Sequence, residues 1–158
     1  YYTRDNDQYK FLIQDGINVL HPTQEMIDEE NSKDNENKKT NNYSYVFLIN
    51  YGKTKIVLVG DAEEKVWEDI IDCYSDELED VDILKASHHG RESGYCGDAL
   101  SIMKPQYTVV SVGKKSEHDV YSKYKYHTKK DVLSTRYYGN IIIELNKNGI
   151  TNISTDRD

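Results

Sequence analysis

Three short polar turns carry the residues that are best able to do chemistry, and each turn follows an apolar run. Asp61 ends the first run, His88 and His89 follow the second, and a Ser-Val-Gly turn at 111–113 closes the third, with His118 soon after it. Functional groups in open α/β sheets gather at the carboxyl ends of the strands. We therefore expect Asp61 and the two adjacent histidines to meet at one edge of a sheet.

A carboxylate beside two imidazoles favours a site for a divalent metal. An aspartate at a strand end can bridge two cations, imidazole suits zinc, and mixed oxygen and nitrogen ligands also admit manganese or iron. Two cations about 3.5–4 Å apart would lower the pKa of a shared water and polarise the bond to be cleaved. From the residue types alone, a turn aspartate with two surface histidines is an equally weighted alternative.

The elements that must position these residues follow from the hydropathy pattern. Residues 56–59 are apolar in succession, which is typical of a strand buried on both faces. Val66, Trp67 and Ile70 recur at helical spacing. The order of elements predicts an α/β fold with a mixed β-sheet flanked by helices. The predicted elements are two short extended pieces within 11–20, two strands within 43–59, strands at 81–86 and 107–112, helices at 62–75, 95–103 and 121–133, and a hairpin of 138–145 and 150–154.

Length and composition bound the remaining possibilities. Residues 1–158 suffice for one domain with a core, and the almost wholly polar stretch 28–42 predicts an exposed, mobile loop. With 28 acidic and 20 basic residues, the net charge of −8 disfavours broad electrostatic binding to DNA or to anionic membranes. The sequence has no apolar run that could span a bilayer and no signal-peptide pattern, and its two cysteines are too few for a disulfide framework. These features favour a cytoplasmic chain.

Four motifs in order resemble the second half of metallo-β-lactamase-fold proteins of the competence-protein type, which belong to DNA-uptake channels. The motifs are NNYSYVFLINYGKTKIVLVGD at 41–61, DILKASHHG at 82–90, MKPQYTVVSVG at 103–113 and STRYYGNIIIEL at 134–145. The resemblance implies the C-terminal half of an αββα sandwich, and a position outside the cytoplasm if the chain belongs to such a channel. It also implies a partner, the first half of the same domain with its HxHxDH motif, which this sequence lacks.

The same resemblance implies roles for individual residues. Asp61 would be the metal ligand that bridges two ions, and one histidine of the HHG turn would be the last ligand while its neighbour lies in the substrate pocket. We assign the ligand to His89 and the pocket role to His88. His118 stands near the place where the family has a His-Pro, and we give it a substrate-side role, with a solvated loop residue as the alternative. The implied cofactor is a divalent metal, zinc or alternatively manganese, with two ions in the intact domain.

The expected function is that of part of a metal-dependent hydrolase that cleaves phosphodiester bonds, including those of DNA, through a metal-activated water. His88 would stabilise charge on the phosphate oxygens, and Lys114 with Lys115 could hold a phosphate, although an exposed lysine pair is the simpler interpretation. Two alternatives stay open, because this fold supports many chemistries. One is the hydrolysis of a thioester, amide or lactone, and the other is a binding module without catalysis. We favour a first half encoded upstream over one supplied by another chain, and over a domain that has lost catalysis.

Overall fold

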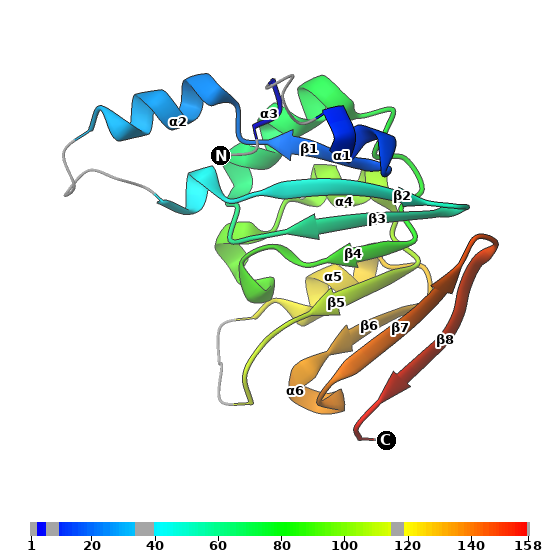
Figure 1. Cartoon of the computed structure of the whole chain (residues 1–158). Helices are drawn as coiled ribbons and strands as arrows, with labels where there is room; N and C mark the ends of the chain where they lie inside the picture. The colour runs from blue at the N-terminus through cyan, green and yellow to red at the C-terminus, as the bar shows by residue number, and fades with distance from the viewer. Residues whose placement is uncertain (1–2, 6–9, 34–39, 115–118, 158) are drawn as a thin grey trace.

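The chain forms a layered α/β structure in which helices cover one face of a mixed sheet (Figure 1). The computed structural model describes residues 3–5, 10–33, 40–114 and 119–157. Within these ranges, six strands form one sheet in the order β1-β2-β3-β4-β5-β6, and β7 and β8 form a separate hairpin. The predicted α/β class, with a mixed sheet flanked by helices, is confirmed.

The parallel half of the sheet fixes where the candidate residues lie. β1, β2 and β3 are antiparallel neighbours, whereas β3, β4, β5 and β6 run parallel to one another. The carboxyl ends of these four strands therefore meet at one edge, as expected for the strands that precede Asp61 and the two histidines. The strands are β1 (Ile17–His21), β2 (Val46–Tyr51), β3 (Thr54–Val59), β4 (Ile83–Lys85), β5 (Tyr107–Val110) and β6 (Asp131–Ser134).

Three crossover helices pack on one face of this sheet. They are α3 (Glu64–Tyr74), α4 (Gly97–Met103) and α5 (Tyr121–His127), and Figure 1 shows them behind the strands. Trp67 of α3 is 3% exposed, and its Nε1–H donates to the carbonyl of Gly94 at 3.3 Å. The residues buried between the helices and the sheet are alternate strand residues, as the twofold period of a strand requires, and they include Val46, Leu48, Val57, Val59, Leu84, Val110 and Val132.

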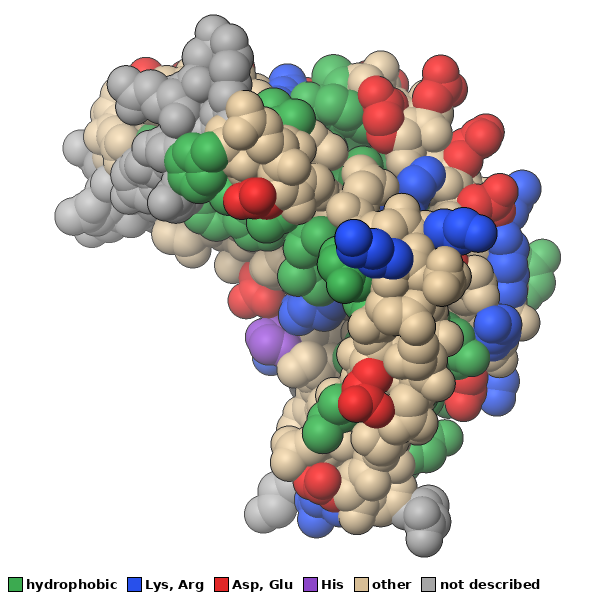
Figure 2. All heavy atoms as spheres, turned by 45° about the vertical axis from the view of Figure 1, so that its right-hand side comes forward, with side chains coloured by type: hydrophobic (Ala, Val, Ile, Leu, Met, Phe, Trp, Pro, Cys, Tyr) green, Lys and Arg blue, Asp and Glu red, His purple; other side chains and the backbone are tan. Residues whose placement is uncertain are grey.

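The opposite face of the sheet is covered only in part by the described residues. The hairpin of β7 (Ile141–Asn146) and β8 (Gly149–Thr155) lies near β6 in Figure 1, and α1 (Lys10–Gln14) lies near β1. The hairpin turn contacts the β2–β3 turn, where the N–H of Lys53 donates to the carbonyl of Lys147 at 3.1 Å. Figure 2 shows Lys and Arg side chains gathered around the end of the hairpin.

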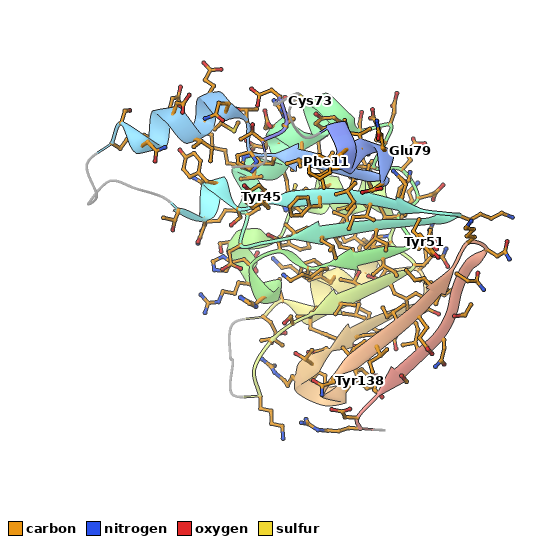
Figure 3. The ribbon with its side chains drawn as sticks, in the orientation of Figure 1. Phe11, Tyr45, Tyr51, Cys73, Glu79 and Tyr138 are labelled. Carbon is orange, nitrogen blue, oxygen red and sulfur yellow. The ribbon has the colours of Figure 1, made fainter. Side chains whose placement is uncertain are left out.

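Apolar side chains between α1 and the hairpin remain open to solvent on this second face. Tyr51 of β2 and Leu58 of β3 point away from the helices and are 44% and 38% exposed. Tyr45 stacks on Phe47, with ring centroids 5.3 Å apart. Figure 3 labels Tyr45 and Tyr51 along this part of the sheet, with Phe11 of α1 above them. Parallel strands are ordinarily covered on both faces.

Two predicted elements are wrong in type. The first of the two extended pieces within 11–20 is the helix α1, because Gly16 takes a positive φ of 79° and closes a helical turn with its N–H donating to the carbonyl of Ile13 at 3.0 Å. The helix predicted over 121–133 ends at His127, and β6 follows it. Val132 and Leu133 of β6 are buried, so tertiary burial prevails over the weak helical pattern.

The polar stretch 28–42 is not a loop throughout. Residues 28–31 belong to helix α2 (Gln24–Asn31), and residues 40–42 begin the 3-10 helix η3 (Thr40–Tyr43), whereas 34–39 lie outside the described residues. The closing hairpin begins at Ile141 and not at 138, since Thr135–Tyr138 forms the short helix α6. The side chain of Ser134 caps α6 by accepting the N–H of Arg136 at 3.3 Å.

No helix in the described ranges combines the length and the apolar character needed to cross a bilayer.

Candidate functional site

Asp61 follows β3 at the sheet edge and is held by the segment that enters β2. The Asp61 N–H donates to Ser44 Oγ at 3.0 Å, and the Gly60 N–H donates to the carbonyl of Tyr45 at 2.9 Å. A Cβ at position 60 would lie 3.0 Å from Ser44 Cβ, so glycine permits this close approach. The Asp61 carboxylate, with 40% of its side chain exposed, is thereby presented at the surface of the edge.

The HHG turn after β4 has an unusual backbone. His88, His89 and Gly90 have φ values of 44°, 56° and 76°, so three successive residues take the left-handed conformation. This conformation is strained for a residue with a Cβ, and such strain gathers at functional sites. The turn lies in η4 (Ser87–Gly90) and is fixed at both ends. The His88 N–H donates to the carbonyl of Gly60 at 3.0 Å, and the Val120 N–H donates to that of Gly90 at 2.8 Å.

The ring of His89 has one nitrogen held by the protein backbone and the other facing Asp61. Its Nδ1 lies 2.7 Å from the carbonyl oxygen of Ser111, and its Nε2 lies 3.4 Å from Asp61 Oδ1. A carbonyl only accepts, so Nδ1 carries the proton of this hydrogen bond. In the neutral ring, the Nε2 lone pair then faces a carboxylate oxygen. The Nε2 lone pair and the carboxylate oxygen repel each other at this distance unless a proton or a cation lies between them.

His88 has different surroundings, although it is adjacent in sequence. Its side chain is 12% exposed, and its Nδ1 lies 2.8 Å from Ser93 Oγ and 3.9 Å from Glu63 Oε1. Asn41 Nδ2 donates to the same Glu63 oxygen at 3.2 Å. Ser93 belongs to η5 (Glu92–Gly94), and Glu63 follows Asp61 in the same loop. A hydroxyl either donates or accepts, so the proton on His88 is free to occupy either ring nitrogen.

Sequence reasoning missed Glu63, Ser93 and the carbonyl of Ser111. Of the three, only Glu63 could have been found from the sequence, because a second carboxylate two residues after Asp61 belongs to the same turn. The Ser111 contribution comes from the main chain and does not depend on the side chain at that position. The three contacts divide the HHG turn into one ring anchored by backbone and one anchored by side chains.

Two side chains of the His-bearing strand connect it to the Asp-bearing loop. Lys85 Nζ donates to the carbonyl of Val59 at 2.7 Å and to that of Ala86 at 3.2 Å. Burial lowers the pKa of Lys85, and the nearby Asp61 carboxylate opposes this shift. Ser87, which is 1% exposed, donates to the carbonyl of Ala62. The bond to Val59 joins β4 to the end of β3, and the bond to Ala62 joins the segments that follow the two strands.

The other predicted residues lie apart from this centre or outside the described residues. His118 and Lys115 fall outside the described residues, and Lys114 is exposed after the end of β5. His21, for which the sequence predicts no site role, is 1% exposed; its Nδ1 lies 3.0 Å from the carbonyl of Ser44, and burial lowers its pKa. Among the residues whose placement is described, no group of three His, Cys, Asp or Glu side chains could hold a metal ion.

Comparison with known proteins gives one informative similarity. No protein-family model matches the chain. Over 74 residues, or 47% of its length, the chain is 34% identical to Recombination protein 2 of Haemophilus influenzae. In sequence, the chain thus resembles a recombination protein. It spans 9% of the length of that relative. The resemblance to metallo-β-lactamase-fold proteins therefore depends on the four sequence motifs alone.

Proposed function

We propose that this chain is the second half of a metal-dependent hydrolase of the metallo-β-lactamase type, acting on phosphodiester bonds. The observation that carries the proposal is the approach of His89 Nε2 to Asp61 Oδ1 at 3.4 Å, with His89 Nδ1 bonded to the Ser111 carbonyl. A histidine that ligates a metal ordinarily donates its other ring N–H to a carbonyl or carboxylate, which fixes the tautomer that ligation requires.

The separation of the two atoms fits a shared cation. Two donors that each lie about 2.0–2.1 Å from a tetrahedral zinc ion are about 3.3–3.4 Å apart. The observed separation of 3.4 Å therefore agrees with a pair of ligands to one ion. A bound divalent cation would supply water activation and neutralisation of phosphate charge at this position. Asp61 and His89 would hold it from the carboxyl ends of β3 and β4.

The remaining ligands would come from the first half of the same domain. A catalytic zinc site takes three protein ligands, and within the described residues we assign two, Asp61 and His89. The second face of the sheet supports such a partner, since Leu58 and Tyr51 are 38% and 44% exposed there. A second sheet layer would bury these side chains, as in other two-layer domains.

The two histidines would have separate tasks. His89 would be the ligand, because the Ser111 carbonyl holds a proton on Nδ1 and leaves Nε2 to donate its lone pair. His88 would act on the substrate, because Ser93 and Glu63 orient its ring while its Nε2 can carry a hydrogen to a phosphate oxygen. The exposed Lys114 would attract the anionic substrate. The name of the relative refers to recombination, which favours a nucleic-acid phosphodiester over the other bonds that this fold cleaves.

The test uses the protein produced from the complete reading frame that contains this chain. With manganese or zinc it should hydrolyse bis-p-nitrophenyl phosphate, and Asp61→Ala should abolish the activity. A panel of a thioester, an amide and a lactone is run in parallel. Turnover of one of these without phosphodiesterase activity would assign another bond. If no substrate is turned over and Asp61→Ala changes no metal content, the chain is a binding module and the proposal is wrong.

A further inference from the structure

We propose that the cavity between α2, η3 and α3 binds a small zwitterion that places an ammonium group at the base of the cavity and a carboxylate at its mouth. The cavity has a volume of about 520 Å³, which lies within the range of small-molecule sites. Its walls come from the end of β1, from α2, from η3 and from α3, at the upper left of Figure 1. The side chains on these walls select the chemistry of the ligand.

Two hydrogen-bond acceptors lie in the buried part of the cavity. Asn42 Oδ1 is buried, and no donor among the described residues reaches it. His21 is 1% exposed, and its Nδ1 donates to the carbonyl of Ser44 at 3.0 Å. Burial lowers the pKa of His21, so the ring is neutral at neutral pH and its Nε2 keeps a lone pair. A ligand group that donates several hydrogen bonds therefore suits this end of the cavity.

The charge beside these acceptors favours a cationic donor. The carboxylate of Asp69 lines the same cavity, and Arg4 Nη1 holds it in place by donating to Oδ2 at 2.8 Å. An ammonium group has three N–H donors and no acceptor, and its hydrogen bonds to a carboxylate are stronger than those between neutral groups. It could donate to Asn42, to His21 and to Asp69 at once.

The walls and the mouth of the cavity suit a carboxylate at the other end of the ligand. Met26 and Val66 supply apolar surface, and Val66 is 4% exposed. The exposed lining residues are Lys33, Lys65 and Glu29, so cationic side chains outnumber acidic ones at the mouth. Lys65 lies four residues before Asp69 on α3, a spacing that puts both side chains on one face of the helix. A ligand with an apolar middle and an anionic end would therefore reach from Asp69 to Lys65.

The cavity is separate from the candidate site, although one segment borders both. Asp61, His88 and His89 do not line it. Asn41 and Ser44 flank the two residues of η3 that do, and they bond to the loop after β3 at 3.2 Å and 3.0 Å. The proposal thus concerns a second binding site and does not depend on the hydrolase function.

The experiment is a calorimetric titration, in EDTA, of the protein produced from the complete reading frame that contains this chain. The probe is 6-aminohexanoate, which has an ammonium group, five methylene groups and a carboxylate. Hexylamine lacks the carboxylate and hexanoate lacks the ammonium group, so each should bind at least about ten-fold more weakly, the effect of losing one hydrogen bond to a charged group.

Two variants test the two ends of the site separately. Asn42→Leu keeps the size of the side chain and removes the acceptor, so it should weaken binding of 6-aminohexanoate by roughly ten-fold and leave hexanoate unaffected. Lys65→Met should weaken binding of 6-aminohexanoate by a similar factor and leave hexylamine unaffected. The matched control is Lys125→Met, because Lys125 is exposed on α5, and it should change neither.

The comparison of the three compounds on the unaltered protein does not depend on how the variants fold. The proposal is wrong if 6-aminohexanoate does not bind, or if hexanoate or hexylamine binds as tightly. Binding that neither Asn42→Leu nor Lys65→Met weakens would also overturn it, because the compound would then bind elsewhere. Since EDTA removes divalent metal, a failure of the phosphodiesterase proposal would leave this result unchanged.

Discussion

His89 Nε2 lies 3.4 Å from Asp61 Oδ1, across the carboxyl ends of two neighbouring parallel strands. The other ring nitrogen of His89 is held by the carbonyl of Ser111, at the end of a third parallel strand. The position of one imidazole is thus set by three consecutive strands of the sheet. His88 is adjacent in sequence but is oriented by Ser93 and Glu63.

This difference predicts distinct effects of the two histidines in the complete protein. Under the proposed function, His89→Ala should lower metal affinity by about ten- to 100-fold or more and reduce activity with it, since a ligand would be lost. His88→Ala should lower turnover by about 100- to 1,000-fold while metal content stays nearly unchanged, because the role proposed for His88 is to act on the transition state. The measurement is metal content by atomic emission alongside turnover. His127→Ala, at the far end of α5, is the control and should change neither.

If His88→Ala removes the metal and His89→Ala does not, the two roles are exchanged and the site remains. If both variants keep full activity and full metal content, neither histidine belongs to a functional site.

Lys85→Met should destabilise the fold by about 1–3 kcal/mol, because the carbonyls of Val59 and Ala86 both lose their donor in a largely buried setting. Methionine keeps the length of the side chain and removes the ammonium. Urea unfolding measures the change in the free energy of unfolding. The matched control is Lys147→Met on the exposed hairpin turn, which should change it by less than about 0.5 kcal/mol. Equal effects of the two substitutions would show that the Lys85 bonds contribute nothing to stability.

Gly90→Ala should destabilise the chain by about 1–3 kcal/mol. The φ of Gly90 is 76°, and a Cβ there would lie 2.7 Å from Val110 Cγ1, so both backbone and packing oppose a side chain. Gly113→Ala is the control, because a Cβ at position 113 would meet nothing within 4 Å. Thermal unfolding of the two variants should separate them clearly, and a Gly90→Ala protein as stable as Gly113→Ala would contradict the left-handed HHG turn.

The buried His21 predicts a loss of stability in mild acid. Burial lowers its pKa below the ordinary value of 6.5 in the folded state, so the unfolded chain binds the proton more readily. The stability that neutral His21 contributes is therefore complete above about pH 6.5 and is lost as the pH falls below that value. The free energy of unfolding of the unaltered chain should fall more than that of His21→Gln between about pH 7.5 and about pH 5.5. Parallel pH dependences for the two proteins would argue against this prediction.

Much of the fold could be predicted from local pattern. The consecutive apolar residues of β3 and the helical spacing of Val66, Trp67 and Ile70 predicted the strand and the helix after it, and both are present. The predicted burial of β3 on both faces is wrong, because Leu58 is 38% exposed. The errors fall where local signals are weak. Residues 131–134 follow a helix without a break in composition, and they form a strand because β5 offers a free edge with which they pair. Pairing of that kind depends on residues far away in sequence.

For the candidate site, too, local sequence patterns predicted one part and long-range contacts decided the rest. The sequence by itself determined that Asp61 and the HHG turn follow apolar strands, because strand period and glycine turns are local properties of the chain. Only the tertiary structure decided that His89 faces Asp61, that a main-chain carbonyl of β5's end sets its tautomer, and that Glu63 and Ser93 surround His88. These are contacts between side chains and backbone atoms of different strands. Their geometry depends on strand order and on the left-handed backbone of the turn, which residue types alone do not specify.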